Sequence, residues 1–299
     1  TVDGEAVAAV ADDPELRIPL PHRGNAGDTL RIEIVYGFVS EPTNSGIGWF
    51  NTAGGSYVLN EPDGTRTWLP SNDHPSDKAT YTFTISVPVG DTAVANGTLV
   101  DHRTVGDHDV WTWQQDRPMA TYLIQLLTGD YEVIPGVGPN DLPLINVVLR
   151  KDQATMQPFI DVTPAMLDFF DDYFGSYPLD GYGIAITDSF GGLAMETQGR
   201  SLFSREDFAS GVLGEYEQLL LSHELTHQWF GDAVSPATWS DIWLNESFAT
   251  YGQWMWFEHI GTATVSDQAH SALRNRPPGS TAPPTADEWC GRGWRMRSA

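Results

Sequence analysis

The chain has 299 residues, which is enough for about two domains that each bury a hydrophobic core. Its 40% hydrophobic content excludes a wholly disordered protein, and its single cysteine excludes an intrachain disulfide. The 40 acidic residues outnumber the 16 basic ones and give a net charge of −24, which argues against nucleic acid or an anionic membrane surface as a partner. No apolar run approaches the roughly 18 residues of a membrane span, so we expect none.

The first 136 residues are predicted to form an antiparallel β domain. Alternating or β-rich runs occur at 29–39, 80–89, 110–114 and 120–127, and clusters of Asn, Gly, Asp and Pro separate them. Short strands with such turns favour a sandwich or an open sheet. Residues 134–141, rich in Pro and Gly, are interpreted as a linker.

Residues 137–299 are predicted to form a second domain that mixes strands and helices. We expect strands at 144–149 and 182–187, and helices at 213–230, at 242–260 and from Thr163 onward. The tail from about residue 272, rich in Pro, Gly and Arg, is expected to be irregular. The chain as a whole is therefore assigned to the α+β, multidomain class.

The stretch His223-Glu224-Leu225-Thr226-His227 carries the clearest chemical signal in the chain. Residues four apart lie on one face of a helix, so the imidazoles of His223 and His227 can bind one ion. Glu224 lies about 100° further round, where its carboxylate can reach a water at the metal. The alternative is a surface helix that carries two histidines by chance.

A carboxylate on the next predicted helix strengthens the metal interpretation. A helix–turn–helix can bring Glu246 back beside His223 and His227. Two imidazoles and one carboxylate leave a coordination position open on a tetrahedral ion, as in catalytic zinc sites, whereas structural zinc normally has four protein ligands. The sequence thus predicts one catalytic Zn²⁺ per chain.

With these residues in place, four segments resemble a known family. HELTHQWFGD at 223–232, WLNESFATY at 243–251 and GGLAMETQ at 191–198 are similar to motifs of the gluzincin aminopeptidases of the aminopeptidase N type. Residues 66–79 are similar to a signature of the N-terminal domain of that family. The resemblance implies a β saddle-like domain that leads into a thermolysin-like mixed α/β catalytic domain.

The resemblance also implies a role for each site residue. His223, His227 and Glu246 would hold the zinc, while Glu224 would take a proton from zinc-bound water and pass it to the leaving amine. The remaining matched positions would bind substrate: Glu196 and Glu61 would pair with its N-terminal ammonium, and Gly192 and Ala194 would line its edge.

Some positions leave alternatives open. Glu61 precedes Pro62 and could be an ordinary turn carboxylate. Thr197 replaces the usual Asn of the exopeptidase motif. Asp232 and Asp241 are candidate hydrogen-bond partners for the histidines, although either could be a solvated turn acid.

The C-terminal sequence differs most from the family. Its members carry a downstream tyrosine that stabilises the oxyanion, and a helical domain that closes the cleft, whereas here no tyrosine follows Tyr251. We therefore expect a fragment of a longer enzyme that lacks its C-terminal part.

The predicted function is a zinc aminopeptidase that removes N-terminal residues from peptides with a free N-terminus. A catalytically crippled zinc- or peptide-binding remnant of the same family and a thermolysin-like endopeptidase are the alternatives. The composition favours a secreted location but leaves a cytoplasmic one open, and the sequence predicts neither the preferred N-terminal residue nor the oligomeric state.

Overall fold

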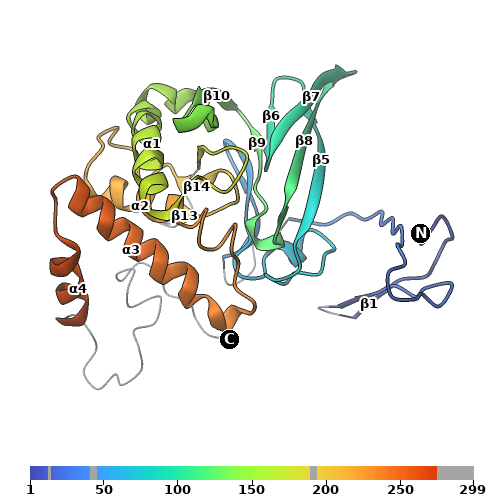
Figure 1. Cartoon of the computed structure of the whole chain (residues 1–299). Helices are drawn as coiled ribbons and strands as arrows, with labels where there is room; N and C mark the ends of the chain where they lie inside the picture. Colours follow the sequence, from blue (N-terminus) through green and yellow to red (C-terminus); the bar gives the residue numbers. More distant parts are fainter. Residues whose placement is uncertain (13–14, 41–45, 189–193, 275–299) are drawn as a thin grey trace.

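The computed structural model describes residues 1–12, 15–40, 46–188 and 194–274 (Figure 1). It has an antiparallel β domain followed by a mixed α/β domain, so the predicted α+β class is confirmed. Within the described ranges, every helix is too short or too polar to cross a bilayer.

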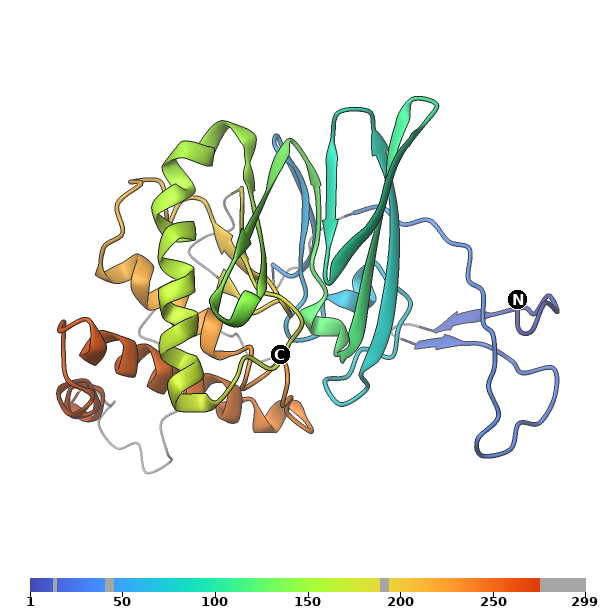
Figure 2. The ribbon, with the colours of Figure 1, turned by 45° about the horizontal axis from the view of Figure 1, so that its top comes forward.

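The N-terminal arm differs from its prediction. Strands β1 (Val10–Asp12) and β2 (Glu15–Arg17) form an exposed hairpin that stands apart from the body (Figure 2). The predicted strand at 29–39 is wrong, because this segment makes only an isolated bridge between Val2 and Ile32. In the described part of the chain it pairs with no strand, and its side chains are exposed.

The β domain consists of two antiparallel sheets. One sheet has the order β3 (Gly48–Thr52), β4 (Gly55–Leu59), β9 (Leu126–Gly129) and β6 (Thr92–Ala95), and the other has the order β5 (Ala79–Pro88), β8 (His108–Met119) and β7 (Thr98–Val105). The strands predicted at 80–89 and 110–114 are therefore confirmed. The range 120–127 is only partly a strand, because Thr121–Leu123 form a 3₁₀ turn, η2, before β9 begins.

The second domain is built on one mixed sheet. Its order is β10 (Tyr131–Val137), β11 (Pro143–Leu149), β12 (Ile184–Thr187), β14 (Ser201–Ser204) and β13 (Ala194–Met195). The central strands β11, β12 and β14 run parallel, while β10 and β13 are antiparallel to their neighbours at the two ends.

The predicted linker at 134–141 is wrong over its first half. Residues 134–137 belong to β10, which pairs with β11 along its whole length. Pro135 is tolerated there because β10 is an edge strand, where a missing N–H costs no ladder hydrogen bond. A boundary after residue 136 would cut this strand, and we therefore propose to divide the domains near Asp130.

Helices cover the face of this sheet that points away from the β domain (Figures 1 and 2). They are α1 (Gln153–Phe174), α2 (Glu215–Thr226) and α3 (Trp243–His259), while α4 (Val265–Arg274) packs against α3. Helix α1 begins ten residues before Thr163 and contains Pro158 and Pro164, so a helix start at the Thr163-Pro164 pair is wrong. Helix α4 extends to residue 274, so the first residues of the tail that was expected to be irregular are helical.

One feature caps helix α2 and another lets it approach α3. At the start of α2, the Glu217 carboxylate accepts a hydrogen bond from the Gly214 N–H at 3.0 Å, which satisfies an end group of the helix. Where α2 and α3 cross, a Cβ on Gly252 would overlap the side chain of Thr226. Glycine at 252 therefore lets the two helices approach closely.

The hydrophobic core continues across the domain boundary. Tyr57 and Leu127 of the β domain pack in one cluster with Val147, Ala185 and Leu202 of the mixed sheet. This shared core fixes the loops of the β domain relative to the helices of the second domain.

Candidate active site

The predicted metal ligands come together between α2 and α3. His223 Nε2 lies 3.3 Å from Glu246 Oε2, and His227 Nε2 lies 3.8 Å from Glu246 Oε1. One donor atom from each residue lies within 4.8 Å of the other two. The close helix crossing thus converts a spacing in the sequence into a three-donor cluster.

The second ring nitrogen of His227 is also bonded. Nδ1 lies 3.1 Å from the Phe230 carbonyl, which can only accept, so the Nδ1–H donates and Nε2 keeps its lone pair for a metal. The expectation that Asp232 or Asp241 supports a histidine is wrong for this ring. Asp241 instead accepts a hydrogen bond from Thr238 at 3.1 Å.

This donor set fits zinc. His223 is 6% exposed and His227 is 1% exposed, and both present ring nitrogens toward a carboxylate. Burial lowers the pKa of His227 to about 4, which keeps the ring in the neutral form that binds metal. Two imidazoles with one carboxylate suit a four-coordinate ion with an open position.

Glu224 lies beside the metal ligands rather than among them. Its carboxylate, that of Glu196 and a ring nitrogen of His227 have donor atoms within 4.8 Å of one another. Burial, and then the neighbouring carboxylates, raise the pKa of Glu224 well above its usual value. The group is therefore placed where a base next to the open metal position is needed.

Glu61 and Glu196 form a second acidic cluster with Glu246. One oxygen from each of the three lies within 4.8 Å of the others. Within the described part of the chain, Oε1 of Glu61 and Oε1 of Glu196 are buried without a hydrogen-bond partner. Burial is the largest cause that raises the pKa of both groups, followed by the Glu196 charge for Glu61 and the Glu246 charge for Glu196. A cation is the natural complement of this cluster.

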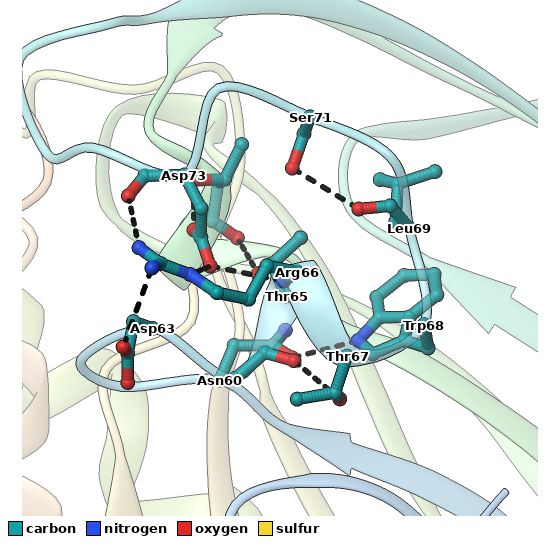
Figure 3. Close-up of polar contacts among 11 residues, drawn as sticks. Asn60, Asp63, Thr65, Arg66, Thr67, Trp68, Leu69, Ser71 and Asp73 are labelled. Carbon is teal, nitrogen blue, oxygen red and sulfur yellow. Dashed lines mark hydrogen bonds and ion pairs between the residues drawn. The ribbon is translucent and has the colours of Figure 1, made fainter. Parts of the chain in front are cut away.

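The loop that carries Glu61 is held by the residue before it (Figure 3). The Asn60 side chain donates to the Ile124 carbonyl at 2.8 Å and accepts from the Trp68 indole N–H at 2.9 Å. The backbone next to Glu61 is therefore held by two hydrogen bonds of Asn60, one of them to a distant segment, which an unconstrained turn would not have.

Asp73 closes the same loop (Figure 3). Its carboxylate accepts from the Arg66 backbone N–H at 2.9 Å and from the Thr121 hydroxyl at 2.5 Å. The Thr65 hydroxyl donates to the Thr121 carbonyl at 2.9 Å, so the loop is tied to η2 at both ends. These contacts give a structural reason for the signature at 66–79.

Tyr122 of η2 links the β domain to both helices of the metal site. Its hydroxyl donates to the Gly231 carbonyl at 3.2 Å and accepts from the Asn245 side chain at 3.3 Å. Gly231 follows the first helix of the metal site, and Asn245 precedes the ligand Glu246. Tyr122 was not singled out from the sequence, because no local pattern marks a contact between distant segments.

The described part of the exopeptidase-like motif begins in the edge strand of the mixed sheet. Ala194 lies in β13, the last strand of the mixed sheet, whereas Gly192 lies outside the described residues. The Thr197 hydroxyl accepts a hydrogen bond from the Gln125 amide at 2.9 Å. The residue that replaces the usual Asn is therefore bonded to the β domain.

Two further residues contribute contacts in or near the segment that follows α2. Neither of them was singled out from the sequence. Lys78 Nζ donates to the carbonyls of Asp232 and Ala233, at 2.6 and 3.2 Å. Gln228 bonds to the segment that carries Glu196. Lysine is scarce in this chain, which has only Lys78 and Lys151, and this scarcity is a sequence signal that could have pointed to Lys78.

Comparison with known proteins places these features in a family. The Peptidase M1 N-terminal domain matches residues 9–123, and the Peptidase family M1 domain matches residues 159–277. Glutamyl aminopeptidase of Bos taurus is 33% identical over 214 residues, which are 68% of this chain and 22% of that protein. Probable aminopeptidase 2 of Sulfurisphaera tokodaii is 32% identical over 206 residues, which are 66% of this chain and 26% of that protein.

Solved structures agree. An M1 zinc metallopeptidase from Deinococcus radiodurans superposes with a TM-score of 0.80 at 30% identity, over 97% of this chain and 69% of that one. A mutant form bound to a Tyr-Ser-Ala substrate gives a TM-score of 0.80 at 31% identity, over 92% of this chain and 63% of that one.

The fold, the site and these matches all indicate the same class of protein, the two-domain zinc metallopeptidases. The chain belongs to peptidase family M1. The predicted resemblance to zinc aminopeptidases is confirmed at the level of the family, since the relatives named above are aminopeptidases. The chain spans about a quarter of the length of these two relatives.

Proposed function

We propose that this chain carries the catalytic centre of an aminopeptidase that binds one zinc ion. The observation that carries the proposal is the juxtaposition of two clusters. The donors His223, His227 and Glu246 fit a metal, and the half-buried Glu61 and the buried Glu196 meet the same Glu246. A metal site beside an ammonium site suits hydrolysis next to a free N-terminus.

Zinc, when bound by His223, His227 and Glu246, would polarise the scissile carbonyl and lower the pKa of water toward about 7. Glu224 would accept the proton of the attacking water on its carboxylate and deliver it to the leaving amine. Its burial and its position beside Glu196 and His227 support this role.

Glu61 and Glu196 would select substrates by the charge of their N-terminus. A free ammonium can bond to the buried oxygens that lack partners, whereas an acetylated amine leaves both carboxylates unpaired in a buried site. The two acids would therefore set the distance from the N-terminus to the bond that is cut.

Backbone at the sheet edge would hold the peptide. Among the described strands, β13, which contains Ala194, pairs only with β14, so its other side can add an extended strand. We extend this role to Gly192 by its place in the same motif. The substrates would be peptides with a free N-terminus, and a secreted location stays a prediction from composition.

The proposal is tested by hydrolysis of leucine p-nitroanilide and its N-acetyl derivative by the zinc-loaded protein. We expect turnover of the free amine only. Glu224→Gln should lower kcat at least about 10²-fold without changing the zinc content, because general acid–base catalysis typically contributes about 10²–10⁴-fold. Glu215→Gln, an exposed position on the same helix, is the matched control and should leave kcat unchanged.

Two results would point to the alternatives. Equal cleavage at internal bonds of N-acetylated peptides would indicate a thermolysin-like endopeptidase. One bound zinc without turnover, even at high enzyme concentration, would indicate a zinc- or peptide-binding remnant.

A further inference from the structure

Gln228 follows the metal ligand His227 and is fully buried, at 0% exposure. Its side chain makes three hydrogen bonds. Nε2 donates to the Glu196 carbonyl at 3.1 Å, while Oε1 accepts from the Gly199 N–H at 2.8 Å and from the Tyr177 hydroxyl at 3.2 Å. No step of the proposed mechanism uses this residue.

The two hydrogen bonds from Gln228 to the backbone take the place of a turn hydrogen bond. Glu196 and Gly199 stand three positions apart, where a β-turn would join the carbonyl of the first residue to the N–H of the fourth. Here the Gln228 amide is inserted between them and bonds to both. The backbone that carries the Glu196 carboxylate is therefore bridged by a side chain next to the metal site.

The length of this side chain connects two positions that an aminopeptidase must hold apart at a fixed distance. His227 sets the position of the metal, and Glu196 sets the position of the ammonium. Gln228 connects them directly, because it is the residue after His227 and its side-chain amide bonds to the Glu196 carbonyl. The backbone route between residues 196 and 227 instead passes through β14 and α2.

We propose that Gln228 is a positioning residue, which fixes the distance between the zinc ligand His227 and the amine anchor Glu196. This inference rests on the proposed function, because it requires that Glu196 bind the substrate ammonium. Gln228 would act through these two residues without touching the substrate. Misplacement of such a group by about 1 Å can cost about 10²-fold in rate.

The test compares two zinc-binding inhibitors that differ only in the amine. Leucine hydroxamate can reach both the metal and the anchors, whereas 4-methylpentanohydroxamate lacks the amine. The ratio of their dissociation constants, measured by calorimetry on the zinc-loaded full chain, reports how well the two sites are spaced. Zinc content and the Tm are recorded for every variant.

The informative variants are Gln228→Met, which keeps the length but loses all three hydrogen bonds, and Gln228→Asn, which keeps the amide but is one methylene too short to reach both backbone groups. Gln218→Met is the matched control, because Gln218 lies on α2, the helix that precedes Gln228, and accepts from the Trp256 indole at 3.1 Å, away from Glu196. In both Gln228 variants, we expect the preference for leucine hydroxamate over the amine-free hydroxamate to fall at least tenfold. Binding of the amine-free hydroxamate should change less than twofold.

The outcomes separate the two ideas. If the wild-type chain binds both hydroxamates equally, the amine anchors are wrong, and the proposed function and this inference both fail. If the wild-type chain prefers the amine and the Gln228 variants keep that preference as Gln218→Met does, only the positioning role is refuted. If Gln228→Met does not fold, the Gln228→Asn variant decides between these results.

Discussion

Replacement of Tyr122 by Phe tests the connection between the two domains. Burial raises the pKa of Tyr122 well above its usual value, so its hydroxyl stays protonated and donates to the Gly231 carbonyl. Phe keeps the ring, which packs edge-on against Trp239 at 5.0 Å between centroids, and removes only the hydroxyl. Any change in stability can therefore be assigned to hydrogen bonds rather than to a cavity.

The magnitude follows from what each partner loses. The Gly231 carbonyl still accepts from the Ser235 hydroxyl, so losing the Tyr122 donor costs only an ordinary net hydrogen bond, about 1 kcal/mol. The Asn245 amide loses its acceptor while buried, at 0% exposure. An unsatisfied buried donor costs about 1–3 kcal/mol, and the 3.3 Å length of this bond favours the low end of that range. The sum is about 2 kcal/mol.

The assay is denaturant unfolding of the zinc-loaded protein, with the loss read from the midpoint at constant m value. Tyr216→Phe is the matched control, because Tyr216 is 49% exposed and its hydroxyl donates to Asp207 at 3.0 Å. We expect the control to change stability by less than about 0.5 kcal/mol. Equal midpoint shifts for the two variants would refute the bridging role of Tyr122.

Three further predictions concern the metal site and its supports. Removal of zinc by a chelator should lower the free energy of unfolding by about 2.7 kcal/mol at 100-fold excess over Kd, and His227→Ala should abolish this dependence in calorimetric scans. Gly252→Ala should destabilise the fold by about 1–3 kcal/mol, because the added methyl group overlaps the side chain of Thr226. The higher helix propensity of alanine, about 1 kcal/mol, opposes this loss only in part. A gain in Tm would contradict the close helix crossing. Lys78→Met should destabilise by about 1–3 kcal/mol, because it leaves the carbonyls of Asp232 and Ala233 without their charged donor, and Lys151→Met, at an exposed position, should change stability by less than about 0.5 kcal/mol in the same unfolding assay.

The metal cluster could be anticipated because its geometry is local. His223 and His227 share one helix face by helical spacing alone, and Glu246 lies on the next helix. The strand at 80–89 was likewise predictable, since its alternation reflects a face that packs on the core. In both cases the pattern and its cause lie within one or two elements.

Longer-range features could not be predicted in this way. The alternation at 29–39 is as regular as that at 80–89, but only the second has neighbouring strands. The start of α1 was missed because proline favours the first turn of a helix, whereas Pro158 and Pro164 lie inside a longer one. Tyr122 and Gln228 join segments far apart in sequence, and no periodicity reports such contacts.

The origin of the site residues has a consequence for folding. The zinc ligands and Glu224 lie on or directly beside two successive helices, so they can meet after closure of the single connection over residues 227–242. Glu61 reaches the same place only after the β domain has docked through the shared core, and Glu196 only after the edge of the mixed sheet has formed. Contacts between distant segments form late, because their loop entropy is lost before they stabilise the chain. We therefore expect a partly folded chain to bind zinc before it can distinguish a free N-terminus from a blocked one.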